Sequence, residues 1–335
     1  MKFPIIAFFN NKGGVGKTAL VYHLAWMYQT LGLKVLAVDF DPQANLTAAF
    51  LDEDQLEEIW LTPDLTNTVF RCFQPLIRGI GDIANPALER IEDGIALLNG
   101  DLQLSGFEDD LSAEWPGCLD RKERSFRVIS AFWRLIQKAA IAEQVDVVLM
   151  DLGPNLGAIN RSALIAADYV VVPLSPDLFS LQGLKNLGPT LVRWREEWQE
   201  RLTKNPALDL RLPQGQMQPI GYVILQQGVR FDRPVKAFKR WIERIPGTYH
   251  QKVLQDDQFP LLDSVLNNIL EDPGCLALLK NYQSLMPMAQ EARKPIFHLK
   301  PADGAIGSHI AAVHSVYNDF KQLALRIATA IDLKL

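Results

Sequence analysis

Short apolar runs recur along the chain, and helical patterns separate them. Such runs are typical of strands buried on both faces of a parallel sheet. They are Ile5–Phe9, Lys34–Asp39, Gly94–Leu98, Asp146–Asp151, Tyr169–Pro173 and Ile220–Leu225. Apolar residues at helical spacing predict helices over Thr18–Leu31, Arg124–Ala142, Ser162–Ala167, Leu181–Glu200 and Ala311–Ile331. We therefore predict an α/β fold: a mostly parallel, doubly wound sheet with helices on both faces.

Two segments, 51–93 and 228–294, interrupt this alternation, and we interpret both as mostly helical insertions into a single domain of residues 1–335. The composition is 48% hydrophobic and 22% charged, which is ordinary for a soluble globular protein. The net charge of −5 argues against a wholly basic nucleic-acid binder but leaves room for a local basic patch.

Cysteine usage and apolar run lengths indicate a cytoplasmic protein. The three cysteines, Cys72, Cys118 and Cys275, are far apart in the sequence, so neither a disulfide framework nor a metal cluster is expected. No apolar run approaches the roughly 20 residues that cross a bilayer, so we expect no membrane span. The apolar N-terminal run leads directly into a glycine-rich turn and is interpreted as a first strand rather than a signal peptide.

The turn after the first strand carries the strongest chemical signal. Residues Asn10–Ala19 read NNKGGVGKTA, between a predicted strand and a predicted helix. Its glycines let backbone N–H groups approach phosphate oxygens, and the start of the helix adds its positive dipole end. Lys17 supplies a point charge for the β- and γ-phosphates, and the Thr18 hydroxyl can ligate Mg²⁺. This pattern predicts a phosphate-binding loop for ATP and Mg²⁺.

The loop departs from the standard pattern because Asn11 stands at the first glycine position and Lys12 follows it. The run Lys-Gly-Gly-Val-Gly-Lys-Thr resembles the deviant Walker A motif of the ParA/MinD family of ATPases, and most closely that of the ParA/Soj partition ATPases. Three further segments extend the resemblance. They are VDFDPQAN at Val38–Asn45, VDVVLMDLGPNLG at Val145–Gly157 and ALIAADYVVVPLSPDLFSLQGL at Ala163–Leu184.

The resemblance implies a role for each site residue. Lys12 would reach across a homodimer to the partner's nucleotide, where a cation neutralises charge on the leaving phosphoryl group. Asp41 would position the attacking water, so Lys12, Lys17 and Asp41 are the expected catalytic residues. Thr18, Asp39 and Asp151 are the expected Mg²⁺ ligands, directly or through water. The residues expected to bind the nucleotide are Gly13, Gly14, Val15, Gly16, Lys17, Thr18, Ala19 and Gln226.

The family also implies an output: an ATP-bound homodimer that binds DNA without sequence preference until a protein partner stimulates hydrolysis. A basic cluster in the divergent segment fits this expectation, since cations on one helix face bind phosphates by releasing counterions. The candidate DNA-binding residues are Arg230, Arg233, Lys236, Lys239 and Arg240, with Arg244 beside them. The aromatic residues between them are expected to anchor the helix rather than to stack on bases.

Two other outputs stay open. The segment 228–294 could dock a protein effector, which would make the chain an ATP-dependent sensor or regulatory switch. A MinD-like membrane-positioning ATPase would need a basic amphipathic tail, but the last helix ends at Asp332–Leu335 without a basic run. Its apolar stripe, from Ile310 to Ile331, is therefore expected to be core. Metal-cluster carriers with related loops need clustered cysteines, which are absent from the sequence.

Overall fold

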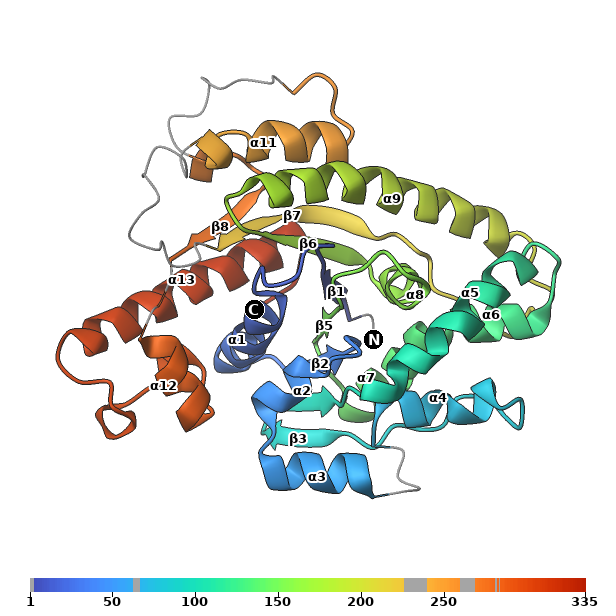
Figure 1. The fold of residues 1–335 in the computed structure, drawn as a ribbon, viewed down its shortest axis with the longest axis horizontal. Coiled ribbons are helices and arrows are strands. Elements are labelled where there is room, and N and C mark those ends of the chain that lie inside the picture. The colour runs from blue at the N-terminus through green and yellow to red at the C-terminus, as the bar shows by residue number, and fades with distance from the viewer. Residues whose placement is uncertain (1–2, 63–66, 226–239, 260–268, 281, 283) are drawn as a thin grey trace.

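An eight-stranded sheet forms the centre of the fold in the order β3-β4-β2-β5-β1-β6-β7-β8 (Figure 1). The computed structural model describes residues 3–62, 67–225, 240–259, 269–280, 282 and 284–335. The strands are β1 (Ile5–Phe8), β2 (Val35–Asp39), β3 (Glu89–Glu92), β4 (Ile95–Leu98), β5 (Val147–Asp151), β6 (Tyr169–Leu174), β7 (Gln218–Leu225) and β8 (Cys275–Leu279). Only β3 pairs antiparallel, with β4. The predicted mostly parallel sheet is confirmed.

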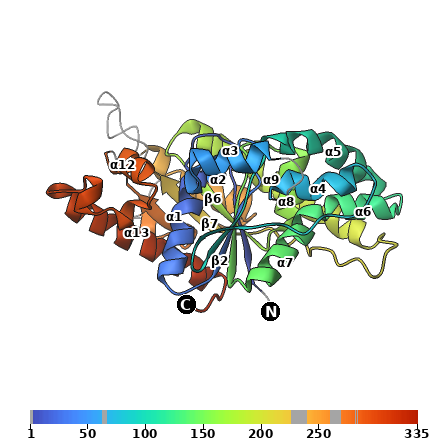
Figure 2. The ribbon, with the colours of Figure 1, turned by 90° about the horizontal axis from the view of Figure 1, so that it is seen from below.

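Helices cover both faces of this sheet, because its central strands are apolar on both sides (Figure 2). Along β5, Val148 and Met150 pack into one hydrophobic cluster, whereas Val147 and Leu149 pack into the other. The first cluster includes α4 (Val69–Ile77), α5 (Glu108–Gly117), α6 (Glu123–Ile129), α7 (Ala131–Glu143), α8 (Ala158–Ala166), α9 (Leu178–Leu202) and α11 (Ile245–Thr248). The second includes α1 (Lys17–Thr30), α2 (Asn45–Phe50), α3 (Glu53–Leu61), α12 (Leu285–Ala292) and α13 (Ser308–Ala330).

Short helices of other types complete the described elements. Four are 3₁₀ turns, at Leu102–Phe107, Ile269–Glu271, Ile296–His298 and Pro301–Asp303. One is a π-helical turn, η2 (Tyr249–Val253), which continues α11. Among the described residues, none of the helices combines the length and apolar composition that a bilayer crossing requires.

Three expectations for the elements need correction. The helix predicted over Arg124–Ala142 is two helices, α6 and α7, because the backbone leaves helical geometry at Ser130. In the segment 228–294 the described residues include helices α11 and α12, but also a strand that the prediction lacks. This strand, β8, pairs in parallel with β7 and extends the central sheet. The segment 51–93 likewise contributes strand β3 to the opposite edge.

The carboxyl ends of β2, β5 and β1 lie side by side, which brings the sequence motifs together. Asp39 at the end of β2 stands opposite Asp151 at the end of β5, and Phe8 of β1 stands opposite the same aspartate. Loops that follow adjacent parallel strands share one edge of the sheet, where open α/β sheets bind ligands.

Candidate active site

The glycine-rich loop joins β1 to α1 and holds a backbone shape that requires glycine. Gly14 has φ +69° and Gly16 has φ +81°, a region that side-chain-bearing residues rarely adopt. A Cβ added to Gly16 would lie 2.8 Å from Cδ2 of Leu225. Gly16 is also the N-cap of α1, and no described side chain caps the amides of the first turn. These N–H groups are therefore available to an anion.

Lys17 lies beneath the loop and is buried. Its ammonium group donates to the carbonyl oxygens of Lys12 (3.3 Å) and Asn10 (3.4 Å). Burial lowers the pKa of Lys17, while the carboxylates of Asp151 and Asp41 oppose that change. These two carbonyl bonds are long, so the ammonium group can exchange them for charged phosphate oxygens.

Asp39, Asp151 and Thr18 form the acidic side of the site. The Thr18 hydroxyl donates to Oδ2 of Asp151 at 2.6 Å. Burial raises the pKa of Asp39 to about 7, against two hydrogen bonds from Thr47. Burial, and then the charge of Asp39, raise the pKa of Asp151 to about 8. Burial and mutual repulsion therefore disfavour the ionised forms of these two carboxylates, and a bound cation would stabilise them.

The donor set fits Mg²⁺ bound together with phosphate. Oδ1 of Asp151 is buried and has no hydrogen-bond partner among the described residues. A buried acceptor without a partner is costly, and a hard cation or its bound water satisfies it. No group of three or more His, Cys, Asp or Glu side chains in the described ranges could hold a metal ion alone. A Mg²⁺ site draws its remaining ligands from substrate phosphates and water.

Asp41 lies just beyond β2, beside the loop that follows β5. It is buried, and its Oδ1 accepts a hydrogen bond from the backbone N–H of Gln43 at 3.0 Å. A Cβ added to Gly153 would lie 3.2 Å from that same oxygen. The absence of a side chain at Gly153 therefore lets the loop after β5 pack closely against Asp41.

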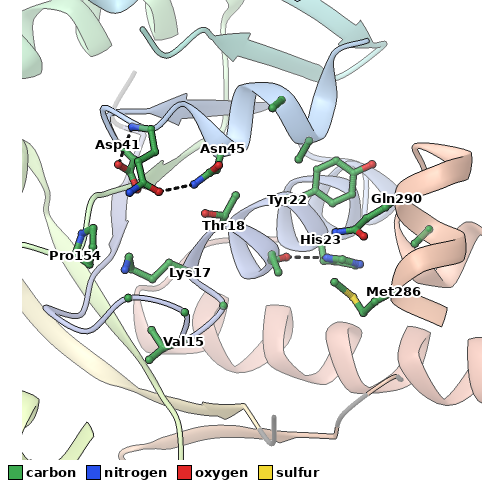
Figure 3. A pocket seen from close by; sticks show the side chains of 18 of the residues that line it. Val15, Lys17, Thr18, Tyr22, His23, Asp41, Asn45, Pro154, Met286 and Gln290 are labelled. Atoms are coloured by element: carbon green, nitrogen blue, oxygen red, sulfur yellow. Dashed lines mark hydrogen bonds between the residues drawn. The ribbon is translucent and has the colours of Figure 1, made fainter. Parts of the chain in front are cut away.

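A cavity of about 740 Å³ runs from these groups to helix α12 (Figure 3). The glycine-rich loop and Asp41 line one end. Tyr22 and His23 of α1 line the other, opposite Met286 and Gln290 of α12. A cavity of this size accommodates a nucleotide, with phosphates at the glycine-rich end. No local sequence signal connects α12 with this site, because the helix reaches the cavity only through the tertiary fold.

The sequence was compared with family models and with known proteins. A family model described as an AAA domain matches residues 3–204, which is more than half of the 335 residues. The chromosome partitioning protein ParA of Caulobacter vibrioides is 29% identical over 198 residues, 59% of this chain and 66% of that protein. The sporulation initiation inhibitor protein Soj of Bacillus subtilis is 27% identical over 188 residues, 56% of this chain and 64% of that protein. This chain belongs to the ParA/Soj-type P-loop ATPases.

Solved structures place the whole chain in the same fold. A Corynebacterium diphtheriae protein covers 98% of this chain and is itself 98% covered, with a TM-score of 0.67 and 27% identity. Cobyrinic acid a,c-diamide synthase of Mycobacterium smegmatis, solved with ADP and magnesium, has a TM-score of 0.50 and 25% identity. The match covers 72% of this chain and 80% of the synthase chain. The chain spans only 43% to 66% of the length of the first curated relatives it matches.

Lys12, the first lysine of this ParA-type loop, is not among the residues that line the cavity. Its ammonium group forms an ion pair with Asp177, and each side chain is 26% exposed. Asp177 also caps the N-terminus of α9 by accepting from the N–H of Ser180 at 2.9 Å. The exposed ring of Phe179 lies 6.0 Å from the ammonium group. Within one chain, Lys12 is therefore held at the start of α9.

Sequence reasoning missed the residues that fix the loop after β5. Glu108 of α5 accepts hydrogen bonds from the N–H groups of Ala158 (2.5 Å) and Ile159 (2.9 Å), and so caps α8 with a charge. Asn160 of α8 donates to the carbonyl oxygens of Gly153 (2.9 Å) and Asn155 (2.7 Å). The loop after β5 thus starts at Asp151 and ends at α8, whose first turn is held by another element.

Several expected contacts lie outside the described residues. These are the adenine contact of Gln226 and the candidate DNA contacts of Arg230, Arg233, Lys236 and Lys239. Arg240 and Arg244 are described, and both are exposed. Their guanidinium groups lie 5.3 Å and 5.6 Å from the ring of Trp241.

Proposed function

We propose that this chain is a Mg-ATP-dependent switch that closes into a homodimer around nucleotide and reopens when a protein partner stimulates hydrolysis. The observation that carries the proposal is the convergence of Lys17, Asp39, Asp41 and Asp151 at one end of the sheet, with Lys12 held just outside it. The names of the relatives, a chromosome partitioning protein and a sporulation initiation inhibitor, support a cytoplasmic role in positioning DNA or another cargo.

Each site residue has a proposed task. The amides of Gly13–Ala19 cradle the phosphates, and Lys17 balances the charge of the β- and γ-phosphates. Thr18, Asp39 and Asp151 hold Mg²⁺ directly or through water, and the ion neutralises charge on the phosphate oxygens when bound. The Asp41 carboxylate accepts a hydrogen bond from the attacking water. Lys12 leaves Asp177 and reaches the triphosphate of the partner chain, where the transferred phosphoryl group carries negative charge.

Light scattering after size exclusion, with fluorescent ATP binding and phosphate release, tests this proposal. The wild type is expected to dimerise with Mg-ATP but not with ADP. Lys17→Ala should lose ATP binding, and retained affinity would remove the phosphate-loop assignment. Asp41→Ala should bind ATP and accumulate as a dimer, so a monomeric and fully active variant would contradict its water-positioning role.

Lys12→Ala separates the two lysines. It should bind ATP with little loss of affinity yet fail to form the active dimer, because the proposed contact of Lys12 with nucleotide is made only across the interface. Lys34→Ala is the matched control, since this lysine is exposed at the start of β2, remote from the loop. If Lys12→Ala dimerises and hydrolyses ATP as the wild type does, the trans role of Lys12 is wrong.

DNA binding without sequence preference is the proposed output of the ATP-bound dimer. Its support is the basic cluster from Arg230 to Arg244, of which Arg240 and Arg244 are exposed. Binding of ATP-loaded protein to random duplex DNA should weaken strongly between about 50 mM and 200 mM salt, because phosphate contacts release counterions. Absence of ATP-dependent binding, or no loss at the higher salt, would favour a switch that docks a protein effector through 228–294.

A membrane-positioning role has less support. The apolar stripe of α13 is expected to be core, but its first residue, Ile310, is 55% exposed. Further along the stripe, Phe320, Leu323 and Ile327 are buried in the second hydrophobic cluster. These side chains cannot insert into a bilayer while they pack against the sheet layer.

A further inference from the structure

The start of α9 and the segment 241–253, which includes α11 and η2, lie on the opposite face of the sheet from α12 (Figure 1). Residues of both line a second concave surface. It encloses a cavity of about 430 Å³. We call it the α9–α11 groove. Apolar side chains form its floor and cations form its rim. The floor residues are Leu178, Leu181 and Trp241, and the rim cations are Lys185, Arg244 and Lys252. The exposed acid Glu243 also lines the groove, so three cations stand against one acid there.

The walls of the groove are held together by direct backbone contact. A Cβ added to Gly188 of α9 would lie 1.7 Å from the carbonyl oxygen of Lys252 and 2.9 Å from Cα of Val253. Only glycine lets a helix and the η2 turn approach so closely. Tyr249 and Val253 of the turn are buried in the first hydrophobic cluster. The groove is therefore preformed, which reduces the ordering cost of binding a partner.

A buried polar network anchors the same segment from behind. The Asp272 carboxylate accepts from the hydroxyl of Tyr222 on β7 at 2.5 Å and pairs with Nε2 of His250 at 2.6 Å. The ring of His250 stacks on Phe259 with centroids 3.7 Å apart. Fully bonded buried networks of this kind rigidify the elements they join. The η2 wall of the groove is thus fixed to the central sheet.

The chemistry of the groove favours an acidic peptide over a nucleic-acid backbone. Lys185, Arg244 and Lys252 are exposed, and none forms an ion pair with a described residue. Leu178 is 56% exposed, and Trp241 is partly buried beside it in the groove lining. Duplex phosphates would meet the rim cations but leave the concave apolar floor uncovered. An amphipathic peptide fills the floor with apolar side chains and places carboxylates against the rim.

We infer that the α9–α11 groove is the docking site for an acidic, amphipathic segment of a partner protein. Leu178 on its floor directly follows Asp177, which holds Lys12. A docked segment therefore touches the helical turn from which Lys12 must leave. Through this contact a docked partner changes the rate of ATP turnover, a consequence that rests on the proposed function.

Selection from a phage-displayed library of random 12-residue peptides tests the inference on the full chain without nucleotide. Enriched peptides should carry several Asp or Glu residues among apolar residues. Labelled copies should bind the wild type and lose tenfold or more in affinity for Lys185→Glu/Arg244→Glu/Lys252→Glu. The control variant, Arg78→Glu/Arg121→Glu/Arg211→Glu, reverses three exposed cations elsewhere and should bind as the wild type does.

The remaining outcomes overturn the inference. They are no enriched family of sequences, enriched peptides without acidic residues, and equal binding to the groove variant. Random duplex DNA that binds the wild type but not the groove variant, while no peptide is selected, would assign the groove to nucleic acid instead. Melting curves and fluorescent ATP binding check that both variants fold. Peptide binding is measured without nucleotide, so its result does not depend on ATP-driven dimerisation. The groove can therefore bind peptide although the proposed function fails, and the proposed function can hold although the groove binds no peptide.

The coupling to Lys12 has its own readout. A selected peptide should change the rate of phosphate release by the wild type. Asp177→Asn keeps a capping oxygen for α9 but removes the charge that holds Lys12, so its turnover should no longer respond to the peptide although the peptide still binds. An unchanged response in Asp177→Asn would remove this route of regulation while leaving the docking site intact.

Discussion

His23 joins the helix of the phosphate loop to the C-terminal part of the chain, and its titration should be visible in the stability of the protein. Its Nδ1 lies 2.7 Å from the carbonyl oxygen of Ala19, and its Nε2 accepts from the N–H of Ile296 at 3.2 Å. The ring also stacks on Phe320. The neutral imidazole satisfies both bonds, one as donor and one as acceptor. A second ring proton would face the Ile296 N–H and break the second bond.

The size of the effect follows from the pKa of His23. Burial lowers this pKa from 6.5 to about 4, and the nearby His298 lowers it further against the effect of Ala19. The unfolded chain therefore binds a proton between pH 6.5 and 4 that the folded chain does not. The free energy of unfolding is full above pH 6.5 and falls as the pH drops towards 4. Each pH unit is worth about 1.4 kcal/mol, so the total loss is about 3 kcal/mol.

Urea unfolding from pH 7.5 to 4, on the wild type and on His23→Gln, measures this loss. Glutamine offers a donor and an acceptor but does not titrate, so the difference between the two free energies of unfolding should shrink by about 3 kcal/mol across the range. Subtracting the variant also removes the contribution of other titrating groups. The control is His314→Gln, an exposed position on α13. Parallel profiles for the wild type and His23→Gln would refute the reasoning, as would a His23 NMR titration centred near pH 6.5.

Two further predictions concern the loop and the switch. Gly16→Ala should destabilise the fold by about 1–3 kcal/mol and weaken ATP binding, because it places a side chain on a left-handed backbone with its Cβ 2.8 Å from Leu225. Thermal melting and fluorescent ATP titration measure both effects. Gly106→Ala, where a Cβ has open space, is the control. Glu108→Ala should cost about 1 kcal/mol and speed amide exchange at the start of α8, because two N–H groups lose their acceptor. Its exposed neighbour Asp109→Ala is the control, and equal exchange in both variants would show that the cap does not hold the loop.

The parts of the fold that could be predicted from sequence are those where local pattern and tertiary context agree. The runs Ile5–Phe9 and Val147–Met150 are apolar throughout. The first leads into a glycine-rich turn and the second into Asp151, so both indicate buried parallel strands directly. Strand β8 has an equally apolar sequence, CLALL, but leucine and alanine also favour helices. Its pairing with β7 decides the outcome, and that pairing is invisible from local sequence.

The same limit applies to the site. The residues of the phosphate loop are neighbours in sequence, so their chemistry can be read from one motif. Met286 and Gln290 reach the cavity only because α12 folds back beside α1 (Figure 3). The continuous helical period from Arg124 to Ala142 likewise hides the break at Ser130, whose hydroxyl donates to the carbonyl oxygen of Phe126 at 2.6 Å. A serine that bonds back in this way competes with regular helix geometry.

Lys12 connects the two proposals because its position in one chain differs from its proposed position in the dimer. Its ion pair with Asp177 is about a quarter exposed, and such pairs contribute only about 0–1 kcal/mol. A triphosphate on a second chain offers several negative charges in a site from which water is excluded, where each contact is stronger. Under the proposed function, Lys12 therefore exchanges Asp177 for the triphosphate when two nucleotide-loaded chains meet, and keeps Asp177 without nucleotide. Without nucleotide, Lys12 stays paired with Asp177, and breaking this pair costs little. Asp177 directly precedes Leu178, which lines the α9–α11 groove.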